Sequence, residues 1–297
     1  MHEALFYDDD EGGAAAIAGF ALGGLEAGEP VLLALPGARL DLVRDALGAT
    51  AGSPDLHWTD LAEAGRNPGR IIAVWQTFVA EATAAGRQPR GVGEPAWPGR
   101  SPHELAECHR HETLLNVAFG EGPSWRLLCP YDARRLDPSV LAMARTTHAE
   151  IDDPAHWHAA AHRQLEDALP PGPRPRFEAE LTAQALAGLR SIVRHHALDS
   201  GVSPARAEDL VLAVNELATN SVSYAGGGRL RLWQEATSLV CEVEDRGRLH
   251  DPLVGRLRPP LDQRDGRGLW LVHQLCDLVQ LRSSPAGTVA RIWLHTS

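Results

Sequence analysis

The two halves of the chain differ in their pattern of hydrophobic residues. In the first half, short apolar runs alternate with stretches whose apolar residues recur every three or four positions, as strands and amphipathic helices require. The apolar runs predict buried strands at residues 30–35 and 124–130, and further strands are expected at 56–58 and beginning at 90–92. The helical spacing predicts helices at residues 40–47, 71–84, 104–119 and 140–147. This strand–helix order predicts an α/β domain with a mostly parallel sheet covered by helices.

The second half has a different order of elements. Ser203 and Pro204 supply an N-cap and a first-turn proline for one of its helices. Helices are predicted at residues 183–198, 204–224 and 268–276. Strands are predicted at residues 229–234, 239–245, 278–282 and 288–294. The final strands are spaced for antiparallel pairing, so this half predicts an α+β domain with helices over one mixed sheet.

A proline-rich segment separates the two halves. Residues 169–176 read LPPGPRPR, and these prolines rule out a continuous helix and predict an extended linker. Residues 154–169, just before it, show a helical pattern. We therefore expect three parts along the chain: a domain at 1–150, a helix and linker at 151–176, and a domain at 177–297.

Charge and composition argue against several classes of function. The formal net charge is −11, which argues against a nucleic-acid partner, and the chain has no lysine, which excludes a P-loop or a Schiff base. The four cysteines form no CxxC pair and indicate buried free thiols in a reducing compartment. No signal peptide and no membrane-spanning run is visible. We expect a cytoplasmic protein without a membrane partner.

Candidate chemistry lies on the helix predicted at 204–224. Glu216 and Asn220 are four residues apart and share one face of it. Another face carries an apolar row that can pack on the sheet: Leu210, Val214 and Leu217. A carboxylate and an amide on one helix face can hold a magnesium ion and poise a water or hydroxyl. An ordinary solvated face is the alternative for such a pair.

Further polar and glycine positions follow in order. The strand predicted at 239–245 ends at Asp245, whose carboxylate can accept a hydrogen bond from an adenine amino group. Gly247 lets the backbone approach the base. Gly266 and Gly268 open a helix, where free backbone amides form an anion site suited to triphosphate. Gly287 and Thr288 then begin the last strand.

The order of these motifs resembles the GHKL (Bergerat) ATP-binding fold over residues 177–297. Because no dimerisation hairpin precedes this region, the resemblance narrows to the bacterial anti-sigma factor serine kinases. It implies ATP and Mg²⁺ as cofactors. It also implies two partners, a sigma factor that is sequestered and a STAS-type anti-anti-sigma protein that is phosphorylated on serine or threonine. A homodimer is compatible with the sequence.

The same resemblance implies roles for individual residues. Glu216 would be the general base that takes the proton from the acceptor hydroxyl, and Asn220 would ligate Mg²⁺. Asp245 would recognise adenine beside Gly247, with help from Thr288. A glycine-flanked turn would hold the phosphates: Gly266, Arg267, Gly268 and Leu269.

Some features keep alternatives open. Leu249 stands where the family usually has a second glycine, which favours a non-catalytic module that uses ATP only as a shape-setting ligand. His195 and His196 offer phosphoacceptors for a sensor histidine kinase, although their place on the first helix of this domain favours surface or packing histidines. The lid expected between Pro252 and Gly266 is short and rich in proline and arginine.

Residues 1–150 resemble the methanogen/methylotroph sensory (MEDS) domain. The resemblance rests on these segments: FYDD from Phe6, PVLLALP at 30–36, GVGEPAW at 91–97, Glu112 with Asn116, and CPYD at 129–132. It implies a sensory module with a RecA-like sheet. The turn at 36–39 occupies the place of a P-loop but lacks its glycine pattern and lysine, so we expect no nucleotide hydrolysis there.

A small-molecule pocket is predicted at the strand ends of this half. Its candidate lining is Trp97, Glu112, Asn116 and Tyr131. The alternative is that the two aromatic residues of this set only cap the core. The acidic run at 8–11 predicts a solvated turn.

Histidines raise a metal hypothesis in the same half. His158 and His162 are four apart, with His156 nearby, and can share a metal. His109 and His111 are two apart and point in different directions on a helix. Exposed helix histidines are the preferred interpretation of all of them.

Overall fold

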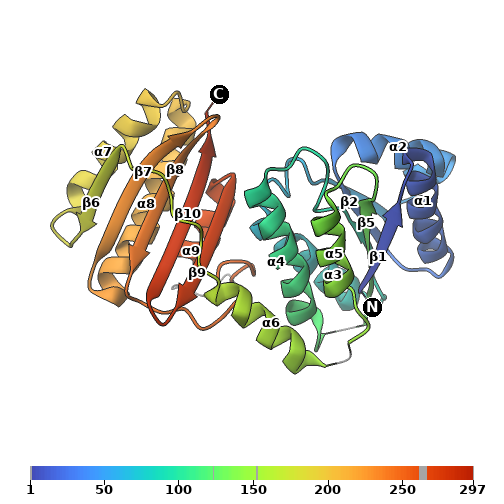
Figure 1. Ribbon diagram of the computed structural model, residues 1–297. Helices are drawn as coiled ribbons and strands as arrows, with labels where there is room; N and C mark the ends of the chain where they lie inside the picture. The colour runs from blue at the N-terminus through green and yellow to red at the C-terminus, as the bar shows by residue number, and fades with distance from the viewer. Residues whose placement is uncertain (1, 123, 152, 261–265, 297) are drawn as a thin grey trace. The chain divides into compact units, whose positions relative to one another are not determined.

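The structure is a computed structural model that describes residues 2–122, 124–151, 153–260 and 266–296 (Figure 1). The chain divides into two compact units, Met1–His158 and Ala159–Ser297. Residues 261–265, which belong to the predicted lid, lie outside the described residues. No helix in the described part of the chain combines the length and apolar character that crossing a membrane requires.

The first unit is built on a five-stranded sheet in the order β1-β5-β4-β2-β3. Its strands are β1 (His2–Tyr7), β2 (Val31–Leu35), β3 (Leu56–Asp60), β4 (Arg90–Gly93) and β5 (Arg126–Asp132). Every described pair in this sheet is parallel, which confirms the α/β prediction. All of β2 is buried, as expected for a strand of a parallel sheet with both faces covered.

Helices cover this sheet on both faces. α1 and α2 pack on one face and share an apolar core with β2, while Figure 1 shows α3, α4 and α5 on the other side. These helices are α1 (Asp10–Glu26), α2 (Gly37–Leu47), α3 (Ile71–Ala84), α4 (Pro102–Phe119) and α5 (Pro138–Thr147), and the chain then forms α6 (Pro154–Glu166), within which the first unit ends. Two short 3-10 helices complete the set: η1 (Gly48–Gly52) and η2 (Pro68–Arg70).

The start of the chain differs from the prediction. The acidic run at 8–11 is not a solvated turn, because Asp9 caps α1 by accepting a hydrogen bond from the Gly12 amide, and Asp10 begins the helix. Neither β1 nor α1 was predicted. The glycines of α1 disfavour a helix although its alanines favour one, and it has almost no amphipathic pattern to mark it in the sequence.

The second unit is built on a five-stranded sheet in the order β6-β7-β8-β10-β9. Its strands are β6 (Phe177–Leu181), β7 (Gly228–Glu235), β8 (Ser238–Asp245), β9 (Leu278–Ser284) and β10 (Gly287–His295). The mixed sheet expected here is wrong, since every described pair is antiparallel. The reason is that β10 inserts between β8 and β9 and runs antiparallel to both. β6, at the sheet edge, was not predicted.

One face of this sheet carries α7 (Leu186–Asp199), α8 (Pro204–Ala225) and α9 (Gly268–Leu275), with the main apolar core between them. α8 begins where the sequence indicated, with the Ser203 hydroxyl accepting from the Arg206 amide. It ends at Gly226, whose φ of 75° forms a left-handed cap. Its apolar row is buried in the core, and Glu216 and Asn220 are left half-buried on another face.

Candidate functional site

One cavity of about 560 Å³ in the second unit is bounded by α8, the end of β8, the start of α9 and the start of β10. The structure brings all the predicted ATP-site residues together in its lining: Glu216, Asn220, Asp245, Gly247, Gly266, Arg267, Gly268, Leu269 and Thr288. These residues come from segments separated by up to about seventy positions in the chain. Their convergence is therefore a property of the fold and not of local sequence.

One end of the cavity is organised by Asp245. The Ser221 hydroxyl lies 2.6 Å from its Oδ2 atom, and the Gly247 amide donates to its Oδ1 atom at 2.7 Å. The Thr288 hydroxyl donates to the Gly247 carbonyl at 2.8 Å. A carboxylate has about four lone-pair positions, so Asp245 keeps acceptor capacity that can face the cavity. Ser221 was not predicted as a site residue.

The strand opposite Asp245 depends on a close backbone approach. Thr288 pairs with Asp245 across the β8–β10 ladder. Its neighbour Gly287 has a φ of 138°, and a Cβ there would collide with the Asp245 carbonyl. Only glycine fits this position. This explains the Gly-Thr pair that the sequence placed at the start of the strand.

The other end of the cavity joins α8 to the start of α9. A Cβ at Gly268 would lie 2.8 Å from Glu216 Oε2 and 3.5 Å from Asn220 Nδ2, so both side chains lie against the first turn of α9. Arg267 occupies the N-cap position of α9, and its side chain makes no capping hydrogen bond. Its guanidinium instead donates to the Pro260 carbonyl at 2.7 Å. Gly266 takes a φ of 79° immediately before.

Leu249, the predicted departure from the family pattern, also lines the cavity. Its amide donates to the Ser283 hydroxyl at 2.9 Å, and that hydroxyl lies 2.8 Å from Thr288 Oγ1. No described residue other than glycine has a positive φ, so Leu249 fits its backbone position without strain. Its side chain packs against the core of the unit.

The lining fits a nucleotide in its chemistry. Apolar side chains that can contact a base also line the cavity: Leu217, Val243, Leu249, Val254, Leu281 and Ala290. The carboxylate and amide oxygens of Glu216 and Asn220 are the ligand type that Mg²⁺ prefers. The first turn of α9 offers backbone amides and the positive end of a helix dipole to phosphate groups.

In the first unit the predicted pocket residues are only partly brought together. Tyr131 donates to Glu112 Oε1 at 3.1 Å. Asn116 lies on α4 with Glu112, and its side-chain amide donates to the Glu112 carbonyl and to the Thr147 carbonyl at the end of α5. Trp97 instead stacks on the Arg100 guanidinium, 3.5 Å from ring centre to Cζ. Among the described cavities, none has Trp97 in its lining.

A second polar group lies at the carboxyl end of the same sheet. Tyr7 donates to Glu94 at 2.8 Å, and Arg39 donates to the Tyr7 hydroxyl at 2.5 Å. Burial raises the pKa of Glu94 from 4.5 to about 7, against the opposing charge of Arg39. Burial, and then the Glu94 charge, also raises the pKa of Tyr7 well above its ordinary value. Glu94 was not a predicted site residue.

The histidines singled out in the sequence do not converge. Among the described residues, a single group of three or more metal-ligating side chains exists, and none of His109, His111, His158 and His162 belongs to it. In the second unit, His195 is exposed on α7 and pairs with Asp199 at 3.2 Å. His196 lies against the ring of Phe177. These positions are those of surface and packing histidines.

The fold and the cavity define an α/β domain joined to a domain with a nucleotide-type cavity, and comparison with known families names both. Residues 1–149 match the family described as MEDS, the methanogen/methylotroph, DcmR sensory domain, and the chain belongs to that family. Residues 177–294 match the histidine kinase-like ATPase domain. Both resemblances seen in the sequence are thereby confirmed. Domains of the second kind bind Mg-ATP.

Comparison with individual proteins adds little. The solved structures that match include the histidine kinase AdeS of Acinetobacter baumannii, which is 13% identical and covers 66% of this chain and 98% of its own. The TM-score of 0.25 is too low for that likeness to support an argument about fold or function. No curated protein matches the sequence.

Proposed function

We propose that the C-terminal domain binds Mg-ATP in this cavity and phosphorylates a serine or threonine of a STAS-type anti-anti-sigma protein. In this proposal the same domain also sequesters a sigma factor, so that phosphorylation decides which partner is held. The observation that carries the proposal is the placement of Glu216. Its carboxylate lies beside the first turn of α9, in the same cavity as Asp245.

Each end of the cavity has a distinct task. Asp245, held by Ser221 and the Gly247 amide, accepts a hydrogen bond from the amino group of adenine. The first turn of α9 and the Arg267 guanidinium face the phosphates. Asn220 supplies an oxygen ligand for Mg²⁺, which neutralises phosphate charge when bound. Glu216 accepts the proton that leaves the attacking hydroxyl.

Partner switching requires the domain to favour different partners in different states. A ligand shifts such an equilibrium only through unequal affinity for the two states. In our proposal, nucleotide in the cavity and a small molecule at the sensory domain supply these unequal affinities. A signal at the first domain then changes how much sigma factor is free.

The test is transfer of radioactive phosphate from ATP to the STAS-type proteins of the same genome. Glu216→Ala should abolish transfer and leave ATP binding intact, because the carboxylate acts on the acceptor and not on the base. Glu208→Ala is the matched control, since Glu208 lies on the same helix but is exposed and paired with Arg194. Equal labelling of the acceptor by Glu216→Ala and wild type would refute the assignment.

Leu249 supports a second candidate, a domain that binds ATP without transferring it. Its side chain occupies lining that a glycine would leave open, and its amide is engaged with Ser283. ATP binding with no acceptor labelled under any condition would favour this candidate. Acid-labile phosphate on the protein itself, lost in His195→Ala or His196→Ala, would instead identify a histidine kinase.

A further inference from the structure

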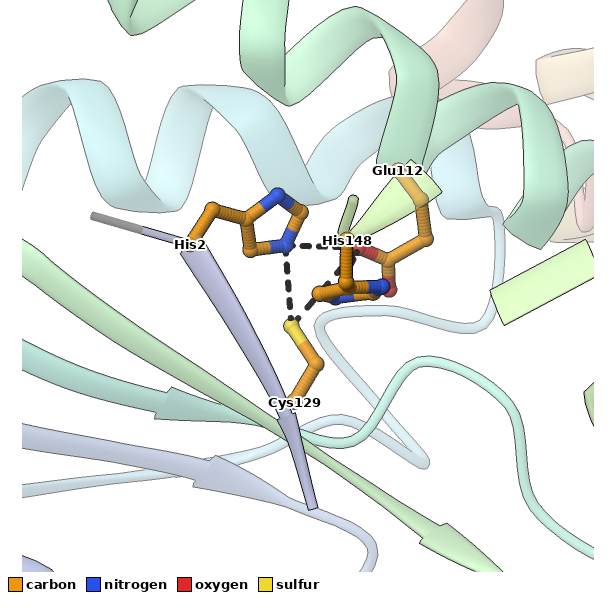
Figure 2. A group of neighbouring side chains, drawn as sticks. All are labelled: His2, Glu112, Cys129 and His148. Atoms are coloured by element: carbon orange, nitrogen blue, oxygen red, sulfur yellow. Dashed lines mark hydrogen bonds and ion pairs between the residues drawn. The ribbon is translucent and has the colours of Figure 1, made fainter. Parts of the chain in front are cut away.

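Four potential metal ligands from four parts of the sensory domain point toward one another beside β1, the edge strand of its sheet (Figure 2). One is on β1, one on α4, one on β5, and one directly follows α5. Their ligand atoms all lie within 4.8 Å of one another. The four residues are His2, Glu112, Cys129 and His148. Of the four, only Glu112 was a predicted site residue, and it was predicted as pocket lining and not as a metal ligand.

Four of the distances between these ligand atoms are close to those between ligands of one tetrahedral ion, and every distance is within 4.8 Å. His2 Nε2 lies 3.0 Å from Glu112 Oε2 and 3.2 Å from Cys129 Sγ. Glu112 Oε2 lies 3.5 Å from His148 Nε2 and 3.6 Å from Cys129 Sγ. Metal–ligand bonds of about 2.0–2.3 Å in a tetrahedron separate the ligand atoms by roughly 3.3–3.6 Å. The cluster therefore needs little adjustment to surround an ion.

Hydrogen bonds outside the cluster orient the first histidine. The Asn116 amide nitrogen donates to two backbone carbonyls, at 2.9 and 3.3 Å, so its oxygen faces His2. That oxygen lies 3.2 Å from His2 Nδ1, which therefore carries a proton. In a neutral ring the Nε2 lone pair then points into the cluster. Metal-binding histidines are held in this way by a hydrogen bond from the other ring nitrogen.

The second histidine is oriented in the same manner. His148 Nδ1 lies 2.8 Å from the Ala144 carbonyl, which can only accept, so Nδ1 is the donor. His148 Nε2 is buried and has no hydrogen-bond partner among the described residues. In the neutral ring, Nε2 then carries the lone pair. A buried lone pair thus faces the Glu112 carboxylate with no proton between them.

We propose that one divalent transition-metal ion of the Zn²⁺ class binds among these four side chains: His2, Glu112, Cys129 and His148. Two imidazoles, a thiolate and a carboxylate are a ligand set that suits zinc and its first-row neighbours. Mg²⁺ and Ca²⁺ are excluded because they require oxygen ligands. The ion would tie together β1, α4, β5 and the end of α5.

An entry path exists on one side of the cluster. A hollow of about 860 Å³ in the first unit includes His2, Asn116 and His148 in its lining, whereas Glu112 and Cys129 are buried behind them. The His2 side chain is 13% exposed and the His148 side chain only 2%, so an ion arriving from this hollow meets His2 first. The Cys129 thiol then loses its proton to solvent as the metal–sulfur bond forms, since only the thiolate is a strong ligand.

The experiment uses the full-length protein without a histidine tag, stripped of metal by a chelator. Titration with Zn²⁺ is followed by calorimetry, and titration with Co²⁺ by absorption in the near ultraviolet. We expect one ion per chain, a thiolate-to-cobalt charge-transfer band and release of the thiol proton to an indicator dye. Binding of less than a tenth of an equivalent by the wild type, or no such band, would overturn the proposal.

Cys129→Ser and Cys108→Ser form a matched pair of variants. Both cysteines are fully buried in this domain, but Cys108 contacts the Pro95 carbonyl and lies outside the cluster. Cys108→Ser should keep the band, and Cys129→Ser should lose it. Loss of a direct ligand should weaken Zn²⁺ binding beyond the roughly 10–100-fold caused by changes around a metal site. A band that persists in Cys129→Ser would contradict the assignment. If that variant does not fold, His148→Gln must weaken Zn²⁺ binding by the same criterion.

Discussion

The Ser221 hydroxyl lies 2.6 Å from Oδ2 of Asp245 and links the middle of α8 to the end of β8. Ser221 is buried, and its backbone sits one residue after Asn220 on the same helix. The helix that carries Asn220, the proposed Mg²⁺ ligand, therefore also orients the Asp245 carboxylate at the opposite end of the cavity. The packing of α8 on the sheet therefore positions the residues at both ends of the cavity.

Ser221→Ala should weaken Mg-ATP binding about tenfold, which corresponds to roughly 1.4 kcal/mol. The carboxylate of Asp245 would keep its bond to the Gly247 amide but lose the hydroxyl that holds its other oxygen. Calorimetric titration measures the change. Ser223→Ala, an exposed position on the same helix, is the control and should bind ATP like the wild type. Equal affinity in both variants would contradict the role given to Ser221.

Gly268→Ala should lower phosphotransfer without lowering stability. The new Cβ would lie 2.8 Å from Glu216 Oε2, the end of a flexible side chain, so the carboxylate would shift and the fold would not. A displaced general base loses its alignment with the acceptor hydroxyl, and we expect a rate loss of at least about tenfold. Denaturant unfolding should be unchanged. Gly188→Ala, where a Cβ meets no atom within 4 Å, serves as the control.

Much of this site could be predicted because its motifs follow one another along the chain in the order typical of the family. The placement of Glu216 and Asn220 on one helix face follows from their spacing alone. Ser221 was not predicted as a site residue because a serine directly after an asparagine belongs to no recognisable motif. Its partner lies twenty-four positions away and becomes a neighbour only through the packing of α8 on β8.

In the first domain, even more of the structure depends on contacts between residues that are far apart in the sequence. The strand at 30–35 was visible as an apolar run because parallel sheets bury both faces. β1 lacks a long apolar run, and the glycine-interrupted α1 lacks an amphipathic pattern, so neither was visible in the sequence. His2 and His148 are 146 positions apart, and their rings come within 4.0 Å only after β1 pairs with β5. No spacing rule could have found that pair.

The stability of the first domain should fall as pH rises from about 4.5 to 7 through the contribution of Glu94. Its folded pKa of about 7 exceeds the ordinary 4.5, so the folded state holds the proton longer and loses relative stability as that proton leaves. The full effect is on the order of 3 kcal/mol. The charged groups facing Glu94 are Arg39 on α2, Asp132 on β5 and Arg135 after it, together with the Tyr7 hydroxyl on β1.

Glu94→Gln removes this titration and should flatten the pH dependence over that window. Hydrogen exchange at the amides of β4 measures it within the first domain of the intact chain. A variant whose exchange free energy changes with pH as steeply as the wild type would show that Glu94 is ionised throughout.

Asn116→Ala should weaken Zn²⁺ binding by roughly 10–100-fold while keeping the thiolate-to-cobalt band. The change removes the oxygen that fixes the His2 tautomer but none of the proposed ligands. Competition with a chelator of known affinity measures the loss. Unchanged affinity would indicate that the orientation of His2 has no part in metal binding.

The most direct test of the nucleotide site is calorimetric titration of the full-length protein with Mg-ATP, comparing wild type with Asp245→Asn. We predict one nucleotide per wild-type chain and at least about tenfold weaker binding in the variant, because an amide nitrogen replaces an acceptor oxygen. Mg-GTP, which has a carbonyl in place of the adenine amino group, should bind the wild type poorly. No heat of binding in the wild type, or equal affinity for ATP in both proteins, would contradict the account.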